Sequence, residues 1–368
     1  NIVQSEVVGP TLGKESIRAG LLSFLLAFVL VLVYMFLYYS RAGLVADLAL
    51  FTNMFFIMGV LASLGAVLTL PGIAGLVLTL GMAVDANVLI FERIREELRA
   101  GKGSRVAVDE GYKNAYSAII DGNVTTLITA IILYIFGSGP VQGFATTLAI
   151  GILSSLFTAI FITRLVFERR LAKGKEISFG NQFTMNTFRN AHFDFLKVRK
   201  ICYAISGTLI VISLISFCTL KLQPGIDFTG GRNYVVRFDQ DVKTNEVRAA
   251  VAAEFGGNPE VKTFGGNDQV RITTNYKIDS NDPAVDKECE GKLYNALKGF
   301  YLKESISESE FTQQVDPRGI QSSQKVQPTI ASELLWDAIW AVLVSLVLIF
   351  IYIAIRFRRW QWAMGATI

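Results

Sequence analysis

Long apolar stretches dominate the chain and determine its expected architecture. Such a stretch must hold about 17–25 residues to cross a bilayer as an α-helix. Seven stretches reach or approach that length, and we expect membrane spans near Ile17–Tyr39, Leu48–Leu70, Gly72–Phe91, Ala118–Phe136, Val141–Ile162, Ile201–Leu220 and Ala338–Ile355. The pattern therefore predicts a mainly α-helical, polytopic transmembrane bundle.

One long polar stretch, residues 223–333, interrupts the apolar runs. Its apolar positions recur with a period of two in some segments and 3.6 in others, as strands and helices require. The predicted elements, in the order strand, helix, strand, strand, helix, strand, are Arg232–Phe238, Thr244–Phe255, Val261–Phe264, Gln269–Thr273, Asp286–Lys303 and Gln314–Ile320, with a turn at Gly265–Asp268 between the two central strands. This order predicts a small α+β domain of the ferredoxin-like, split βαβ type.

Composition supports the membrane assignment and argues against nucleic-acid binding. The mean hydropathy is +0.43, 52% of residues are hydrophobic and 18% are charged. The net charge of +4 comes from Lys and Arg gathered at the ends of apolar runs, where the positive-inside rule places cytoplasmic connections. We therefore expect the basic connections in the cytoplasm, and residues 1–16 and 223–333 on the opposite side of the membrane.

The polar residues do not group into an enzyme or metal site. Cys202 and Cys218 lie 16 residues apart on one run and cannot meet, and Cys289 has no partner in its domain. His192, the only histidine, has no neighbours that would make it catalytic, and we expect a solvated or interfacial side chain. Gly230-Gly231 predicts a turn, because no Lys-Ser/Thr follows it as in a phosphate loop. We expect no catalytic, cofactor-binding or metal site.

Asp85 is the principal candidate for function. It lies within the run from Leu70 to Phe91, which is otherwise free of charge. A carboxylate at such a depth costs about 2.5–3.5 kcal/mol on insertion scales and is a functional site by default. The next charge, Glu92, is roughly 10 Å along a helix, too far for an Asp side chain to reach the interface. We expect Asp85 to face other helices and bind the coupling ion; a purely structural hydrogen bond between helices is the alternative.

Other polar residues of the spans could support a proton pathway or serve packing alone. The possible pathway residues are Asn87, Asp121, Thr125, Thr126 and Thr129. Small residues at intervals of four, Gly143, Thr147, Gly151 and Ser155, predict close helix packing more than a pathway. Arg93 and Arg95 are expected to be topology anchors at the interface.

The chain contains an internal repeat. Val8-Gly9-Pro10-Thr11-Leu12 aligns with Val326-Gln327-Pro328-Thr329-Ile330 at an offset of 318, and each copy precedes a long apolar run that ends in basic residues. Inverted or parallel repeats are common in transporters. The repeat predicts a second bundle beyond Ile368, with an intramembrane carboxylate near the same offset from Asp85.

Several motifs resemble the bacterial SecD and SecF export proteins over nearly the whole chain. Met82-Ala83-Val84-Asp85-Ala86-Asn87 lies in the longest SecD-like motif. The other SecD-like motifs are Thr11–Gly20, Leu70–Gly75, Asp121–Leu127 and Gly137–Ala145, and Phe193–Lys200 and Gly225–Gly231 resemble the start of SecF. The chain is thus similar to a fused SecDF of the RND superfamily, cut at both ends.

The resemblance implies a domain plan. It comprises a SecD-like bundle of five spans (1–166), a cytoplasmic or interfacial linker (167–200), a first SecF-like span (201–222), a small periplasmic α+β domain (223–333), and a second SecF-like span with the start of the next (334–368). A large periplasmic domain should precede Asn1, and a second Asp and an Arg should follow Ile368.

The resemblance also implies a function. It is that of a proton-motive-force-driven accessory of the Sec translocon in the bacterial inner membrane, with Asp85 needed for proton passage. Expected partners are the Sec channel with its associated membrane subunits, unfolded preprotein on the periplasmic side and the lipid bilayer. Protons are the expected coupling ion, and sodium stays open. The alternative is an RND-type exporter of small molecules, which would need an apolar substrate cleft.

Overall fold

The computed structural model describes residues 4–186, 197–220, 226–256, 259–278, 280, 282–302, 306–313 and 318–367. The chain divides into two compact units. One unit joins Asn1–Ser16 to His192–Trp336, and the other joins Ile17–Ala191 to Asp337–Ile368. Both units therefore combine segments that are far apart in the sequence.

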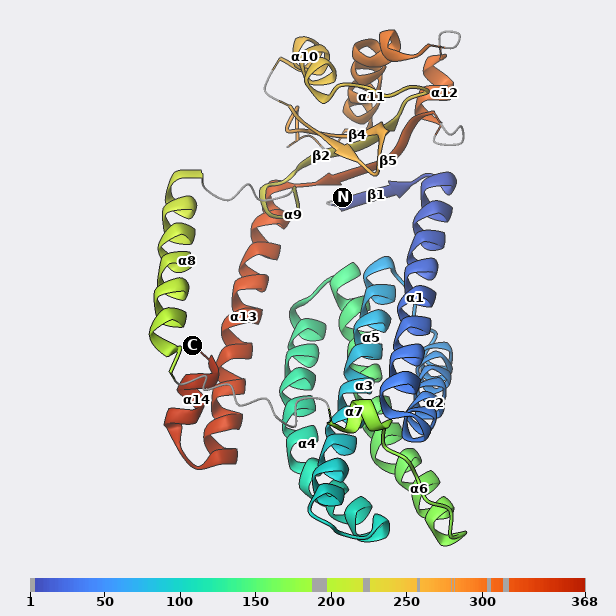
Figure 1. The fold of residues 1–368 in the computed structure, drawn as a ribbon. Helices are drawn as coiled ribbons and strands as arrows, with labels where there is room; N and C mark the ends of the chain where they lie inside the picture. The colour runs from blue at the N-terminus through green and yellow to red at the C-terminus, as the bar shows by residue number, and fades with distance from the viewer. Residues whose placement is uncertain are drawn as a thin grey trace. The chain divides into compact units, whose positions relative to one another are not determined.

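The second unit is a bundle of long helices (Figure 1). Its elements are α1 (Pro10–Tyr39, which starts in the other unit), α2 (Arg41–Ser63), α3 (Leu70–Arg99), α4 (Ser104–Phe136), α5 (Pro140–Phe157), a π-helical turn (Thr158–Ile162), α6 (Thr163–Ala172), α7 (Gln182–Asn186), the greater part of α13 (Pro328–Phe357) and α14 (Trp360–Thr367). With α8 (Arg199–Leu220), seven helices in the described part of the chain are long and apolar enough to span a membrane. The predicted fold class is confirmed.

Most spans are longer helices than the predicted runs; α4, for example, begins at Ser104 rather than Ala118, and α2 is shifted toward the N-terminus. The helix α2 begins at Arg41 and ends at Ser63, whereas the apolar run predicted Leu48–Leu70. The next helix begins at Leu70 because the Thr69 side chain accepts a hydrogen bond from the Gly72 amide (3.1 Å) and Pro71 occupies the first turn. The earlier start of α2 brings Asp47 into the helix, which the sequence prediction had placed outside it.

The largest apolar cluster of the bundle gathers aromatic side chains from α1, α3, α4, α6 and the segment after α6. Phe179 was expected at the membrane interface, but it is buried, with its ring centroid 5.8 Å from that of Phe91 and 5.4 Å from that of Phe167. The amide of Ala42 donates a hydrogen bond to the Ser178 carbonyl (3.0 Å). The start of the expected linker is therefore part of the bundle core; His192 lies outside the described residues.

The first unit holds an antiparallel sheet of five strands in the order β1-β5-β2-β4-β3. The elements are β1 (Gln4–Val8), α9 (Ile226–Thr229), β2 (Gly231–Arg237), α10 (Thr244–Phe255), β3 (Glu260–Phe264), β4 (Gly266–Thr274), α11 (Pro283–Leu297), a 3₁₀ turn (Lys298–Phe300), α12 (Glu308–Thr312) and β5 (Gly319–Val326). Strands β5, β2, β4 and β3 have the predicted split βαβ arrangement, with α10 and α11 on one face (Figure 1).

Three details of this domain correct the sequence prediction. The last strand is Gly319–Val326 rather than Gln314–Ile320, and residues 314–317 lie outside the described residues. The second helix ends at Leu297 and continues only as a 3₁₀ turn to Phe300. The hairpin turn contains Gly265 alone, with φ of +76°, because β4 already begins at Gly266. A glycine adopts this left-handed conformation without a Cβ penalty, so the turn needs fewer residues than expected.

Beside α11, an exposed ion pair lies close to the buried core. Lys277 Nζ lies 2.8 Å from Glu288 Oε2, and the Tyr276 hydroxyl donates to Glu288 Oε1 (2.8 Å). The hydrogen bond from Lys277, followed by that from Tyr276, lowers the pKa of Glu288. Glu288 is thus held in its ionised form next to Cys289, which is buried in the domain core.

The strand β1 was not predicted. It ends at the first residue of the first copy of the internal repeat, as β5 ends at the first residue of the second copy. Strands β1 and β5 pair antiparallel, from Gln4 opposite Val326 to Val8 opposite Ser322. Each strand is followed, two residues later, by a proline that opens a helix of 30 residues: Pro10 opens α1 and Pro328 opens α13. The two copies of the repeat therefore share a strand-proline-helix plan, which supports the offset seen in the sequence.

Candidate ion-coupling site

Asp85 lies near the middle of α3 on its exposed side. Ala74, Leu78, Gly81 and Leu89 share this exposed stripe, at the spacing of one helical face. Among the described residues Asp85 makes no hydrogen bond or ion pair. The expectation that Asp85 faces other helices is therefore not met within this part of the chain. The sequence could not show which stripe of α3 packs, because every face of this helix is largely apolar.

Asn87 points to the opposite side of the same helix, where it is 3% exposed. Its side-chain amide nitrogen donates to the Ala83 carbonyl (3.1 Å), and its Oδ1 has no partner among the described residues. Two residues on a helix are about 200° apart around the axis, so Asp85 and Asn87 cannot belong to one surface. The structure separates these two residues, which the sequence prediction had combined in a single pathway.

Asp121 is held by the last long helix. Its Oδ1 accepts hydrogen bonds from the Tyr352 hydroxyl (2.8 Å) and from Arg356 Nε (2.7 Å), both on α13. Arg356 also donates to the Ser117 hydroxyl, one turn before Asp121 on α4. This cluster connects α4 to α13 through an ion pair. Asp121 is therefore engaged in a contact between helices in this structure.

The three candidate threonines bond to the backbone of their own helix. The Thr125 and Thr126 hydroxyls donate to the Gly122 carbonyl (2.8 and 3.0 Å), and that of Thr129 donates to the Thr125 carbonyl (3.2 Å). Such bonds to the preceding turn are the ordinary way for a threonine to satisfy its donor inside a helix. The geometry thus matches the packing alternative for these hydroxyls.

The small-residue stripe of α5 lies against α3. A Cβ on Gly143 would lie 2.6 Å from Thr69 Oγ1, and one on Gly151 would collide with the Thr79 side chain. Across the same contact, a Cβ on Gly75 would collide with the Thr147 hydroxyl. Ser155 is buried and donates to the Ile152 carbonyl (2.9 Å). Glycines on both helices thus allow α3 and α5 to approach closely.

Arg95 has an environment that the sequence did not indicate. It is 1% exposed, whereas an interfacial anchor was expected. Its guanidinium donates to the Phe179 carbonyl (2.7 Å), the Tyr38 carbonyl (3.1 Å) and Glu92 Oε1 (2.7 Å). The Tyr39 hydroxyl donates to the same Glu92 oxygen (3.0 Å). Arg95 therefore ties the end of α1 and the segment after α6 to α3, because it can donate in several directions at once.

Two further polar residues of α2 were missed. Asp47 is 9% exposed and Asn53 is fully buried. Asp47 Oδ1 and both polar side-chain atoms of Asn53 have no partner among the described residues. Asp47 lies one residue before the predicted span, so the search for charges within apolar runs passed over it. The helix periodicity was the available signal, since Val45, Ala46, Ala49 and Leu50 flank Asp47 on one buried face.

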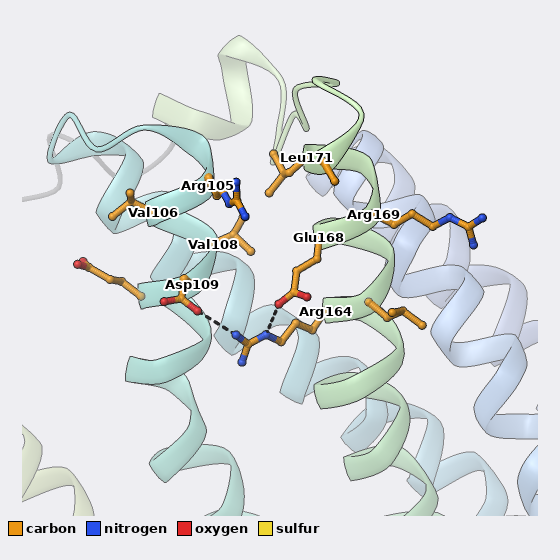
Figure 2. Close-up of a pocket in the computed structure, with 11 residues that line it drawn as sticks. Arg105, Val106, Val108, Asp109, Arg164, Glu168, Arg169 and Leu171 are labelled. Atoms are coloured by element: carbon orange, nitrogen blue, oxygen red, sulfur yellow. Dashed lines mark hydrogen bonds and ion pairs between the residues drawn. The ribbon is translucent and has the colours of Figure 1, made fainter.

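A surface pocket of about 810 Å³ lies between the start of α4 and the length of α6 (Figure 2). Arg164 bridges its two walls, with ion pairs to Asp109 (2.9 Å) and Glu168 (2.7 Å). The lining holds three arginines and three carboxylates, namely Arg105, Arg164, Arg169, Asp109, Glu110 and Glu168. The pocket is therefore charged but balanced, unlike an apolar substrate cleft.

The comparisons with known proteins agree with this architecture. The family described as "Protein export membrane protein SecD/SecF, C-terminal" matches residues 1–169 and 306–368, and the "SecD/SecF GG Motif" matches residues 215–242. The chain is 60% identical over 168 residues to the protein translocase subunit SecD of Rhodothermus marinus, and 58% identical over 168 residues to that of Desulfurispirillum indicum. Each match covers 46% of this chain, and 27% and 33% of those proteins.

A solved structure resembles nearly the whole chain. The crystal structure of SecDF, a translocon-associated membrane protein from Thermus thermophilus, matches with a TM-score of 0.83 and 34% identity, over 98% of this chain and 46% of that one. A SecDF structure in a super-membrane-facing form matches with a TM-score of 0.67 and 33% identity. The chain thus spans less than half the length of these relatives.

Fold and site together define a multi-pass helical membrane protein with a small α+β domain and carboxylates within its spans. The chain belongs to the SecD/SecF family of protein export membrane proteins. The relatives that match are named protein translocase subunits, and the Thermus thermophilus protein is described as translocon-associated.

Proposed function

We propose that the chain is part of a proton-motive-force-driven accessory subunit of the Sec translocon. In this role it promotes preprotein translocation across the bacterial inner membrane by a proton-coupled conformational change. One observation carries the coupling step: Asp85 is a carboxylate halfway along a membrane-spanning helix, with no ion-pair partner among the described residues. A group of this kind can take a proton from one side and release it to the other.

The energy available per proton is sufficient for such coupling. Each charge that crosses the membrane field releases about 2.3 kcal/mol per 100 mV. That energy shifts a two-state conformational equilibrium severalfold or more for each proton bound. The exposed stripe around Asp85 supports the proposal, because a carboxylate bare to lipid would be costly, and the stripe therefore needs water or further protein against it.

The same proposal assigns partners and orientation. The channel and associated membrane subunits of the translocon would contact the bundle, and unfolded preprotein would meet the protein on the periplasmic side, where the α+β domain is placed by the charge asymmetry of the connections. Small-molecule export is not favoured, since the charged pocket between α4 and α6 does not resemble the apolar cleft that such an exporter would need.

Asp85→Asn tests the proposal. It keeps the shape of the side chain and removes its titration. In the full-length protein reconstituted with the translocon, we expect proton flux and the gradient-dependent part of preprotein export both to be lost. Asp109→Asn, at the charged end of α4, is the matched control and should leave both intact. Proton flux and preprotein export at wild-type levels in Asp85→Asn would refute the coupling role. If the wild-type protein instead loses gradient-dependent export in sodium-free buffer, sodium is the coupling ion.

A further inference from the structure

Among the described residues, Asp47 is the buried carboxylate. It is 9% exposed, and its Oδ1 has no hydrogen-bond partner among the described residues. Burying a polar group without a hydrogen-bond partner is unfavourable, and more so when the group carries a charge. A carboxylate in this position therefore needs a proton, a water molecule or both.

The depth of Asp47 follows from the apolar residues around it. Leu50 shares a cluster with Leu80 and Ala83, and Ala46 shares one with Ala86 and Ile90. Asp47 therefore lies beside the middle of α3, at the depth of Asp85 and Asn87. It is on the packed side of α3, whereas Asp85 is on the exposed side.

Two buried amides also lack partners: Asn87, at this depth on α3, and Asn53, about 9 Å further along α2. Asn87 Oδ1 and both polar side-chain atoms of Asn53 are buried and unpartnered among the described residues. The Ser154 hydroxyl donates to the Asn53 backbone carbonyl (3.4 Å), which places Asn53 against α5. Water between these helices and α5 would satisfy the four orphaned polar atoms on α2 and α3, because buried waters typically bond such groups.

The π-helical turn packs against α2, the helix that carries Asp47. Ala159, in this turn, belongs to the same apolar cluster as Ala46 and Ala86. Its neighbour Thr158 is buried and donates to the Ser155 carbonyl (3.1 Å). π-Helical turns within α-helices occur frequently at functional sites. The irregular backbone thus borders the helix that carries two of the three bundle residues with orphaned groups.

Nearby charged groups do not compensate Asp47. On α3, Glu92 and Arg95 pair with each other, and Asp85 is on the other side of the helix. On α6, Arg164 pairs with Glu168 and Asp109. On α1, the Tyr39 hydroxyl is bonded to Glu92. An ionised Asp47 would therefore be uncompensated, and only a proton or water can stabilise it.

We propose that Asp47 is a second proton-binding carboxylate, within a hydrated interior between α2, α3 and α5 that also contains Asn53 and Asn87. The proton enters from water on one side, resides on a carboxylate oxygen of Asp47, and returns to water as the helices rearrange. This inference rests on the proposed function, since the same gradient would load both Asp47 and Asp85.

Asp47→Asn in the full-length reconstituted protein tests this site. It keeps the size and hydrogen-bonding capacity of the side chain, so folding should be retained. We expect proton flux per folded molecule to fall about tenfold or more, as for removal of a positioned proton-transfer group. The infrared band of a protonated carboxyl should also be lost. A purely structural Asp47 would instead lower thermal stability and leave both the flux and its pH profile unchanged, which would overturn the inference.

Two further variants separate the possible failures. Asp47→Glu keeps a titrating group and should shift the pH midpoint of flux; an unchanged midpoint contradicts the site even if Asp47→Asn does not fold. Asp85→Asn is measured in the same assay. Normal proton flux in Asp85→Asn refutes the proposed function. Loss of proton flux in Asp85→Asn together with normal proton flux in Asp47→Asn refutes only the internal site.

Discussion

At the scale of single residues, neighbours in the sequence have very different environments. Arg93 is exposed and pairs with Glu96 (2.6 Å) one turn away on the surface of α3. Arg95 is enclosed and bonds to two backbone carbonyls and a carboxylate from three parts of the chain. The Arg95 guanidinium also lies 4.9 and 4.5 Å from the ring centroids of Tyr38 and Tyr39. Of these two arginines, Arg95 is therefore expected to contribute more to the stability of the fold.

Arg95→Ala should lower the free energy of unfolding by about 2 kcal/mol or more, because the Phe179 and Tyr38 carbonyls lose their charged donor. Arg93→Ala, the matched control, should change it by less than about 1 kcal/mol, as for other exposed ion pairs. Thermal unfolding of the purified variants in the same detergent measures both. Equal effects of the two substitutions would show that Arg95 does not connect these segments.

At the scale of elements, the contact between α3 and α5 depends on glycines that the sequence pattern identified. The residues Gly143, Thr147 and Gly151 face α3, and Gly75 on α3 faces Thr147 in return. Close approach of helix backbones maximises van der Waals contact, which replaces the hydrophobic effect as a driving force within lipid. The packing of these two helices thus follows directly from the spacing of small residues.

Gly151→Ala should destabilise the bundle by about 1–3 kcal/mol, because the new methyl group would collide with Thr79 and force α3 and α5 apart. In Gly59→Ala on α2, the methyl group would meet nothing within 4 Å, and a gain of up to about 1 kcal/mol is expected from helix propensity. The measurement is the free energy of unfolding of both variants and of the wild-type protein in mixed micelles. A neutral Gly151→Ala would indicate that the helices are farther apart than described.

At the scale of the whole molecule, contacts between distant parts of the sequence hold each unit together. The strand β1 pairs with β5, more than 300 residues later, at the edge of the α+β sheet. Within the helical unit, Arg356 reaches Asp121 across 235 positions of sequence (2.7 Å). The two helices of the internal repeat, α1 and α13, therefore have different roles: α1 contributes to the bundle core, whereas the described polar contact of α13 is with α4.

A double-mutant cycle with Asp121→Asn and Arg356→Gln should give a coupling energy of about 0.5–1 kcal/mol, as for a partly exposed ion pair with good geometry. The Asp121 side chain is 17% exposed and the Arg356 side chain is 44% exposed. Arg359→Gln, just beyond the end of α13, should show no coupling to Asp121→Asn in the same unfolding assay. Zero coupling for the Arg356 pair would mean that the contact between α4 and α13 does not form in the membrane.

The sequence by itself determined the class of fold and the order of elements. Apolar length defines a membrane span, because backbone groups in lipid must bond within their own helix, and the periods of two and 3.6 in the polar stretch determined the split βαβ order. The helix Thr244–Phe255 was predicted to the residue. Asp85 and the small-residue stripe were also evident, since both depend on local chemistry and spacing.

The tertiary structure decided which faces of the helices pack and which distant segments meet. Asp85 lies on an exposed stripe, although it was expected to face other helices, and Asp47, one residue outside the predicted span, lies inside the bundle. An almost uniformly apolar helix has no polar face to show its orientation, so only the shapes of neighbouring helices determine it. The burial of Arg95 and Phe179, the pairing of β1 with β5 and the contact of Arg356 with Asp121 likewise depend on long-range contacts, for which a single sequence has no period or spacing.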